Sequence, residues 1–341
     1  MKKHSLFSKI IIILNFISAF LLLLAYLVPY IPPQSFPLIS VLSLGFPVLI
    51  LVNIIFFIYW LFRLKRKMWI SGAVLILGLT YVNKLYQFSG QSELSTSNEL
   101  SLMSYNVRLF NMYDWIKNPT VKSDIQSLVK SENPDIIGMQ EFNGDAEEDF
   151  KKLFPYHYFS FFSNHEKSGQ AIYSKYKIIN KGHLKFKNTN NNVIYADIIK
   201  GNDTIRIYNA HLQSLGINPD VSDLNQDKSK EIFRNVSKTF QRQQDQVAKF
   251  KAHKAKCPYK TIVIGDFNNT AFSYTYNQMK GDLNDAFVEA GKGFGKTFDF
   301  NLFPMRIDFI LTDSAFEVQD FKTFSVKLSD HYPVMAKLSL D

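Results

Sequence analysis

The sequence predicts a layered domain of the α/β or α+β class that follows a set of apolar N-terminal helices. Three observations predict it. The first 92 residues contain no acidic residue and include long uncharged apolar runs. The remaining residues alternate short apolar strand-like runs with helical patterns, and one hairpin signal indicates that part of the sheet is antiparallel. Mixed sheets with helices on their outer faces give this class of fold.

Two apolar runs near the start of the chain, at about residues 10–28 and 38–62, are long enough to cross a bilayer as helices, because about 20 residues suffice. A proline-rich stretch between them is suited to a short turn. A third stretch, at about 68–86, is shorter and rich in glycine, but aromatic residues flank it as they do at membrane interfaces. We predict that it also spans, so that residues 1–90 form a membrane anchor with three transmembrane helices.

Basic residues orient this anchor. Lys2, Lys3 and Lys9 precede the first run, and a basic cluster at 63–67 follows the second, so both ends of the pair are expected in the cytoplasm. Three spans then place the folded domain on the non-cytoplasmic side, whereas two would leave it in the cytoplasm. We expect a multi-pass cell-membrane protein with a periplasmic or extracellular domain, an expectation that depends on residues 68–86.

Charge and cysteine usage exclude some classes of site. Without the eight basic residues of the anchor, 31 Lys and Arg face 30 Asp and Glu, so residues 93–341 carry a net charge of about +1. This balance does not favour a nucleic-acid-binding groove. The single Cys257 excludes an intrachain disulfide framework and Cys-rich zinc sites. Any metal is therefore expected to be held by oxygen and imidazole ligands.

Residues 91–98 are polar and are interpreted as a linker, and residues 99–341 as one domain. Its strand-like runs lie at 101–107, 135–141, 169–174, 193–199, 204–212, 261–267 and 306–313. The sequence Gly201–Asp203 predicts a hairpin turn. Helical patterns lie at 121–130 and 228–253. The second is expected to bury one apolar stripe under a solvated basic face, formed by Ile232, Phe233, Val236, Phe240, Val247 and Phe250.

Polar side chains end or interrupt six of the apolar runs, where a core-facing strand would not place them. They are Asn106, Glu141, His211, Asp266 with Asn268, Asp308, and Asp330 with His331. Any one of them can be explained as a cap or turn residue. Six such places in one domain, with two pairings of an acid and an imidazole, indicate a site.

These residue types suit metal-dependent phosphoester hydrolysis. Glu141, Asp330 and the amide oxygen of Asn106 are the hard ligands that Mg²⁺ or Mn²⁺ prefers. Asp266 and Asn268, two residues apart on a segment expected to be extended, would point the same way and hold the attacking water between them.

Two imidazoles complete the predicted site. His331, oriented by Asp308, would keep a fixed tautomer and could be cationic against the phosphate. His211 would contact the same phosphate from the opposite side, so that His211 and Asn268 are also assigned to substrate binding.

In this order, the motifs LMSYNVRLF, IIGMQEF, SGQAIYSK, IYNAHLQS, VIGDFNN, RIDFILTD and LSDHYPV resemble the endonuclease/exonuclease/phosphatase superfamily. It includes DNase I-like nucleases, abasic-site endonucleases, neutral sphingomyelinases and inositol polyphosphate 5-phosphatases. The resemblance covers residues 99–340 and implies a four-layer αββα sandwich with the site at one end of two facing sheets. By this resemblance, Asn106 and Glu141 match the family's metal-site residues, and Asp266 and Asn268 match its Asp-x-Asn. Asp308 matches the acid that orients the final histidine, and Asp330 and His331 match the final Asp-His pair. His211 matches the histidine of the DNase I, sphingomyelinase and 5-phosphatase branches, which disfavours abasic-site repair.

We therefore expect a membrane-anchored phosphodiesterase or phosphatase that uses Mg²⁺ or Mn²⁺ and acts on a lipid head group or a small phosphorylated molecule. A nuclease of the same superfamily is one alternative. A non-catalytic binding or sensing relative is another, disfavoured because Glu141, Asp266, Asp330 and His331 are all present. Specificity is expected to reside in the loops Phe110–Thr120 and Leu215–Asp227.

Overall fold

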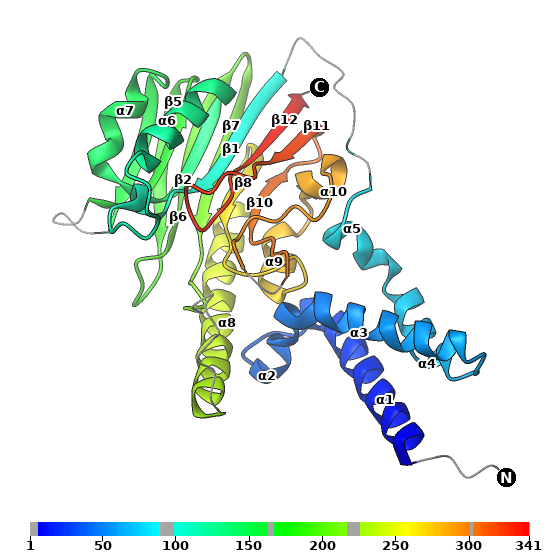
Figure 1. Cartoon of the computed structure of the whole chain (residues 1–341). Coiled ribbons are helices and arrows are strands. Elements are labelled where there is room, and N and C mark those ends of the chain that lie inside the picture. Colours follow the sequence, from blue (N-terminus) through cyan, green and yellow to red (C-terminus); the bar gives the residue numbers. More distant parts are fainter. Residues whose placement is uncertain are drawn as a thin grey trace.

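The computed structural model describes residues 6–88, 90, 99–162, 167–216, 226–300 and 303–340 (Figure 1). The linker expected at 91–98 and most of the loop 215–227 lie outside these residues. An N-terminal group of apolar helices packs below one end of a two-sheet sandwich, and the long helix α8 extends beside it (Figure 1).

The N-terminal group contains two helical segments that are long and apolar enough to cross a membrane, Leu6–Tyr30 and Leu42–Phe62. Its helices are α1 (Leu6–Leu27), α2 (Pro37–Ser40), α3 (Leu42–Phe62), α4 (Met68–Leu77) and α5 (Val82–Leu85). The third expected span is not one straight helix. It is a helix pair, Met68–Leu77 and Leu79–Leu85, bent by 49°.

The bend in the third segment lies at Gly78, where another helix approaches closely. A Cβ atom at Gly78 would lie 2.0 Å from the Tyr26 hydroxyl oxygen, and that hydroxyl donates to the Val74 carbonyl at 3.0 Å. Close approach of this kind is typical of small residues at helix interfaces within membranes. Gly78, one of the glycines of the stretch 68–86, therefore allows close helix packing.

Buried polar side chains join the three long apolar segments. Asn15 Nδ2 of α1 donates to Ser71 Oγ of α4 at 3.0 Å, and Ser71 Oγ donates to Asn53 Oδ1 of α3 at 2.9 Å. Asn53 Nδ2 donates in turn to Ser18 Oγ of α1 at 2.8 Å. Such interhelical hydrogen bonds fix helix register where apolar contacts alone do not specify it.

Two six-stranded sheets form the sandwich. One has the order β11-β12-β1-β2-β4-β3 and the other β5-β6-β7-β8-β10-β9. The strands are β1 (Glu99–Asn106), β2 (Ile136–Asn143), β3 (Tyr156–Phe161), β4 (Ser168–Ser174), β5 (Ile178–Lys185), β6 (Asn192–Lys200), β7 (Asp203–His211), β8 (Lys260–Asp266), β9 (Asn284–Asp285), β10 (Asp308–Thr312), β11 (Phe316–Thr323) and β12 (Val334–Leu340). The pairs β1/β2 and β7/β8 are parallel and the other pairs are antiparallel, which confirms the expected mixed sheets.

Helices cover both outer faces of the sandwich and make it four layers. Residues of both sheets form the central core, for example Leu102 and Ile172 with Ile264. The helices are α6 (Val121–Glu132), α7 (Glu147–Lys151), α8 (Gln226–Lys254), α9 (Tyr274–Lys280) and α10 (Ala286–Ala290). One outer cluster joins α6 and α7 to the first sheet, and the other joins α8 and α9 to the second. The αββα sandwich implied by the resemblance is confirmed.

The seven expected strands are observed as β1, β2, β4, β6, β7, β8 and β10, and the hairpin at Gly201 joins β6 to β7 with Lys200 paired to Asp203. The sequence did not indicate β12, which lies between β11 and β1, or the strands β3, β5, β9 and β11, which are the edge strands of the two sheets. Edge strands mix polar and apolar residues on their open side, so their alternation is weak.

The helix expected at 228–253 is α8, but its apolar stripe is shorter than predicted. Val236 and Phe250 are buried, whereas Ile232 and Phe233 are 36% and 40% exposed. The prediction was wrong for these two residues because the N-terminal end of α8 extends away from the sandwich (Figure 1).

Candidate active site

The strand register brings three of the predicted residues to the same end of the second sheet. His211, the last residue of β7, is paired with Asp266, the last residue of β8. Asp308, the first residue of the antiparallel β10, is paired with Asp266 from the other side. His211, Asp266 and Asp308 therefore lie abreast across three neighbouring strands.

A bulge in β2 aims Glu141 toward this group from the facing sheet. Met139 pairs with Ala171 and Phe142 with Gly169, so two residues of β2 oppose one residue of β4. Glu141 has φ +49°, a conformation that non-glycine residues rarely adopt. Bulges redirect side chains in this way beside functional sites, and here the bulge directs the Glu141 carboxylate toward the cavity.

Asp266 lies at the centre of the site and is 1% exposed. Its Oδ1 accepts from the Asn268 backbone N–H at 2.7 Å, and its Oδ2 accepts from Asn268 Nδ2 and from Asn106 Nδ2, each at 3.1 Å. Burial raises the pKa of this carboxyl to about 7, against the opposing effect of the His331 charge. A carboxylate with such a pKa is suited to accept a proton near neutral pH.

Asn268 does not lie on an extended segment as expected. Strand β8 ends at Asp266, and Asn268 has φ +49°. Its amide nitrogen donates both to Asp266 and to the Leu212 carbonyl at 3.0 Å. The chain turns here because the next residues leave the sheet, so that Asn268 fixes the Asp266 carboxylate directly instead of facing it across a water.

Asn106 joins the two sheets within the site. Its Nδ2 donates to Glu141 Oε1 at 3.2 Å as well as to Asp266, and its Oδ1 accepts from the Arg108 backbone N–H at 3.1 Å. Both ends of the buried amide are therefore engaged. Asn106 holds Glu141 and Asp266 in a fixed relation to each other. Its amide oxygen, expected as a metal ligand, is engaged by Arg108, and the metal role of Asn106 stays a prediction.

His331 is buried between two carboxylates. Its Nδ1 lies 3.0 Å from Asp308 Oδ2, and its Nε2 lies 3.7 Å from Asp266 Oδ2. Burial lowers the pKa of His331, but the charges of Asp308 and Asp266 outweigh it and raise the pKa to about 10. This imidazole is consequently cationic at neutral pH, with Nδ1–H donating to Asp308, as the sequence suggested.

His211 differs from His331 in its charge state. Its Nε2 lies 3.8 Å from both Glu141 Oε1 and Asp266 Oδ2, and its Nδ1 has no hydrogen-bond partner among the described residues. Burial lowers the pKa of His211. The site therefore pairs a neutral imidazole on one side of Asp266 with a cationic imidazole on the other.

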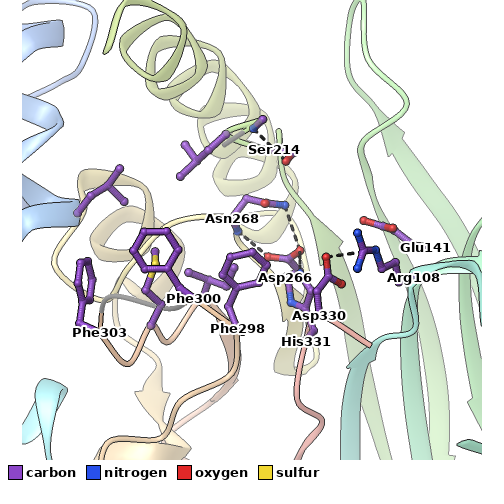
Figure 2. A pocket seen from close by; sticks show the side chains of 15 residues that line it. Arg108, Glu141, Ser214, Asp266, Asn268, Phe298, Phe300, Phe303, Asp330 and His331 are labelled. Carbon is purple, nitrogen blue, oxygen red and sulfur yellow. Dashed lines mark hydrogen bonds and ion pairs between the residues drawn. The ribbon is translucent and has the colours of Figure 1, made fainter. Parts of the chain in front are cut away.

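The oxygen donors at the Glu141 side of the site suit a divalent cation. The carboxylates of Glu141 and Asp330 both line the cavity, and the Arg108 guanidinium lies beside them (Figure 2). Arg108 Nε is 3.3 Å from Asp330 Oδ2, so the Asp330 carboxylate is already paired with one positive group. Hard oxygen ligands with room for water are what Mg²⁺ and Mn²⁺ require, and the residues present fit such an ion.

A second group, Asp266, Asp308 and His331, also presents ligand atoms within 4.8 Å of one another. It is less suited to a metal. The Nδ1 of His331 is engaged with Asp308, so only Nε2 of that ring would be available to a metal, and Asp266 already accepts three hydrogen bonds.

The site opens into a cavity of about 480 Å³ with two kinds of wall. The polar wall contains Arg108, Glu141, Asp266, Asn268, Asp330 and His331. The apolar wall contains Leu44, Phe298, Phe300, Phe303, Met305 and Ile307. Asn106, His211 and Asp308 lie behind the polar wall and hold its members, so all eight predicted residues meet at one place.

Sequence reasoning missed Arg108 and the whole apolar wall. Arg108 stands two residues after Asn106 in a motif that was recognised, and this proximity was a usable signal. The segment Phe298–Phe303 alternates aromatic and polar residues at its start, as a half-buried strand does, and this pattern does not mark a cavity. Of the two expected specificity loops, Leu215 lines the cavity. No described residue of 110–120 lines it, although Trp115 stacks under Arg108 with 4.4 Å from guanidinium carbon to ring centroid.

A buried carboxylate with a raised pKa, a cationic imidazole and an oxygen-rich cation position at one end of a two-sheet sandwich define a metal-dependent phosphoester hydrolase. The family described as Endonuclease/Exonuclease/phosphatase matches residues 103–331, and the chain belongs to this family. A second family, a domain of unknown function, matches residues 8–85. No curated protein matches the chain.

Solved structures share the fold of the catalytic domain. An endonuclease/exonuclease/phosphatase from Bacteroides vulgatus is 19% identical with a TM-score of 0.55, over 72% of this chain and 100% of that one. A mannosyl-6-phosphatase from Bacteroides thetaiotaomicron is 21% identical with a TM-score of 0.51, over 71% and 100%. The human Nocturnin catalytic domain is 16% identical with a TM-score of 0.53, over 75% and 97%.

Proposed function

We propose that the chain is an Mg²⁺- or Mn²⁺-dependent phosphoester hydrolase held in the membrane by three apolar segments. The observation that carries the proposal is the position of Asp266. This buried carboxylate is held by Asn106 and Asn268. It is flanked by one neutral imidazole, His211, and one cationic imidazole, His331.

Asp266 activates water in the proposed reaction. A water oxygen forms a bond to phosphorus, the bond from phosphorus to the leaving oxygen breaks, and the proton of the water passes to Asp266. The leaving oxygen takes a proton from solvent. Asn268 supports this step because its two donors hold Asp266 in one orientation.

His331 and Arg108 bind the phosphate in this proposal. Both line the cavity and both are cationic, and preorganised positive groups stabilise charge that grows on phosphate oxygens. The neutral His211 lies behind the polar wall, with its Nε2 3.8 Å from Glu141 Oε1 and from Asp266 Oδ2, and is suited to position these two carboxylates; its contact with the phosphate stays a prediction. A divalent cation held by Glu141 and Asp330, with Asn106 fixing Glu141, would supply further neutralisation of charge on the phosphate.

Contacts between the catalytic domain and the N-terminal helices support three spans and a non-cytoplasmic site. Asn277 Nδ2 donates to the Pro29 carbonyl at the end of the first segment, and Thr270 Oγ1 donates to the Ser43 carbonyl at the start of α3. The basic cluster at 63–67 follows the far end of α3, about 30 Å away at 1.5 Å per residue. The positive-inside rule places that cluster in the cytoplasm, so the domain would face the other side.

A nuclease is the principal alternative within the family. A nuclease would be expected to line its groove with several basic residues. Among the described residues that line the cavity, only Arg108 and the imidazolium of His331 are cationic. The phosphatase or phosphodiesterase is therefore favoured.

The test uses the full-length protein in detergent and a phosphate-free buffer, with bis(p-nitrophenyl) phosphate and p-nitrophenyl phosphate as substrates. We expect turnover with Mg²⁺ or Mn²⁺, its loss in EDTA, and a fall of at least about 10³-fold for Asp266→Asn. Asp282→Asn is a matched control because the Asp282 side chain is 83% exposed and pairs with Lys254. Turnover that persists in Asp266→Asn, or that is unaffected by EDTA, would refute the proposal.

A further inference from the structure

The two walls of the cavity face different parts of the molecule. Figure 2 shows Glu141 and Arg108 at one end, and Phe300 and Phe303 at the other, with Asp266 and His331 between them. The aromatic end also receives Leu44, which belongs to the first turn of α3. A molecule in this cavity thus contacts both the catalytic residues and a segment apolar enough to span a membrane.

The aromatic segment is joined directly to the catalytic residues. Phe298 forms a β-bridge with His331, and their rings lie 5.0 Å apart between centroids. The Asp299 N–H donates to the Asp330 carbonyl at 2.8 Å. Phe300 and Phe303 then contact each other edge to face, with 5.2 Å between centroids. The apolar wall is therefore positioned by the same segment that positions His331.

The start of α3 is joined to the other side of the site. Thr270 follows Asn268 by two residues, and its hydroxyl donates to the Ser43 carbonyl at 3.0 Å. Slightly further along both segments, Phe46 of α3 stacks on Phe272 with 4.0 Å between ring centroids and 7° between their planes. Leu44 lies between these two contacts, so α3 forms part of the cavity wall by a built interface.

The apolar lining continues beyond the cavity toward the N-terminal helices. A small neighbouring cavity shares Phe303 and Met305 with the first and is also lined by Pro47 of α3 and Leu85 of α5. Lys84 and Arg306 also line this small cavity, so apolar and basic residues together connect the first cavity to α3 and α5.

We infer that the substrate is a membrane phospholipid whose phosphate binds beside His331 and Arg108 and whose acyl chain lies against Leu44, Phe300 and Phe303. This inference rests on the proposed function. Sugar hydroxyls or base edges placed at the apolar wall would lose their hydrogen bonds to water, which is costly without new partners. An acyl chain that moves from the bilayer to this wall loses none, because it carries no hydrogen-bonding group.

The size of the cavity agrees with partial extraction of such a lipid. Its volume of about 480 Å³ lies within the roughly 300–1,000 Å³ of small-molecule sites. It accommodates the phosphate region and the first part of a chain, while the remainder stays between α3 and the bilayer. Hydrolysis then forms one bond from the water oxygen to phosphorus and breaks one phosphorus–oxygen bond of the lipid, with the water proton passing to Asp266.

The test compares lipids with their deacylated counterparts on the wild-type full-length protein in dodecyl maltoside with Mg²⁺ or Mn²⁺. The pairs are dioleoyl phosphatidylglycerol with glycerophosphoglycerol, and dioleoyl phosphatidic acid with glycerol 3-phosphate. We expect kcat/KM for one of the lipids to exceed that of its counterpart by at least about 100-fold, because only the lipid contacts the apolar wall and is held in the same micelle as the enzyme. This comparison does not depend on any variant folding.

The outcomes separate this inference from the proposed function. If bis(p-nitrophenyl) phosphate is cleaved but the lipids are no better substrates than their deacylated counterparts, the lipid inference is contradicted and the proposed hydrolase activity stands. Preference for thymidine 5′-(p-nitrophenyl) phosphate over both lipids would overturn it in favour of a nucleotide. Absence of turnover on all of these substrates would overturn the hydrolase and the lipid together.

Variants locate the effect in the apolar wall. We expect Phe300→Ser with Phe303→Ser, and separately Leu44→Ser, to lower the ratio of lipid to deacylated kcat/KM at least tenfold. Ile199→Ser is the control. Ile199 is 37% exposed and lies near one end of β6, whereas the site lies at the other end, where Asn192 pairs with His211. An equal change for both members of a substrate pair in the wall variants would contradict the inference.

Discussion

Asp266 Oδ2 and His331 Nε2 lie 3.7 Å apart in the buried centre of the site. Both pKa values are raised, Asp266 to about 7 by burial and His331 to about 10 because the carboxylates of Asp308 and Asp266 outweigh its burial. Between these values a carboxylate and an imidazolium coexist. This is the combination that water activation and phosphate binding require.

A bell-shaped pH profile follows from this pair. Activity is lost as pH falls, when Asp266 takes a proton, and as pH rises through about 10, when His331 loses one. A bound divalent cation lowers the carboxyl pKa, so the acid limb is expected at or below pH 7. Asp308→Asn removes a charge that raises the His331 pKa, so its alkaline limb should move to lower pH. The measurement is kcat/KM from pH 5 to 11, and an unmoved alkaline limb would be inconsistent with the pairing.

His331 itself should be strongly required for turnover. We expect His331→Ala to lower kcat by at least about 100-fold, the usual scale for a group that stabilises transition-state charge. His183→Ala is the control, because His183 lies on the edge strand β5 and contacts Tyr158. The readout is kcat on bis(p-nitrophenyl) phosphate, and a rate for His331→Ala within a few-fold of wild type would remove His331 from the mechanism.

Metal affinity should distinguish the two candidate groups of ligands. We expect Glu141→Gln to weaken Mn²⁺ binding at least tenfold, because a carboxylate ligand is lost. Asp308→Asn should leave Mn²⁺ affinity nearly unchanged, since Asp308 is engaged with His331. Calorimetric titration of the full-length protein with Mn²⁺ measures both. If Asp308→Asn weakens binding as much as Glu141→Gln, the ion is held by Asp266, Asp308 and His331 instead.

The proposed orientation can be tested on the intact chain. An alkaline phosphatase fused after residue 341 should be active in cells, and a fluorescent protein fused there should be dark after Sec-dependent export. A cysteine introduced at Arg66, in a Cys257→Ser background, should react with an impermeant maleimide only after the cells are opened. If the fusion is fluorescent and position 66 is also labelled only after the cells are opened, both lie in the cytoplasm, and two spans, not three, precede the domain.

The extent of the sequence prediction has a physical explanation. The eight polar residues could be recognised because they end, interrupt or adjoin apolar runs, and the strands of both sheets bring them to one end of the sandwich. Leu44, Phe300 and Phe303 could not be recognised, because an apolar residue beside a cavity has the same pattern as one in a core. The wall they form also depends on contacts such as Phe46 with Phe272, between segments far apart in the chain.

Gly265 offers a stability test of how the site is positioned. It precedes Asp266, has φ +134°, and a Cβ atom there would lie 2.0 Å from the Ala210 carbonyl oxygen of the neighbouring strand β7. Gly265→Ala must separate β7 from β8 or change the backbone at Asp266, so we expect a lower melting temperature and a loss of activity larger than the loss of folded protein. Gly201→Ala is the matched control. Gly201 also has positive φ, at +60°, but nothing lies within 4 Å of its Cβ position, so its cost is the conformational strain alone, about 1–2 kcal/mol. Equal effects of the two substitutions on melting temperature and on kcat would show that the close contact of β7 with β8 does not position Asp266.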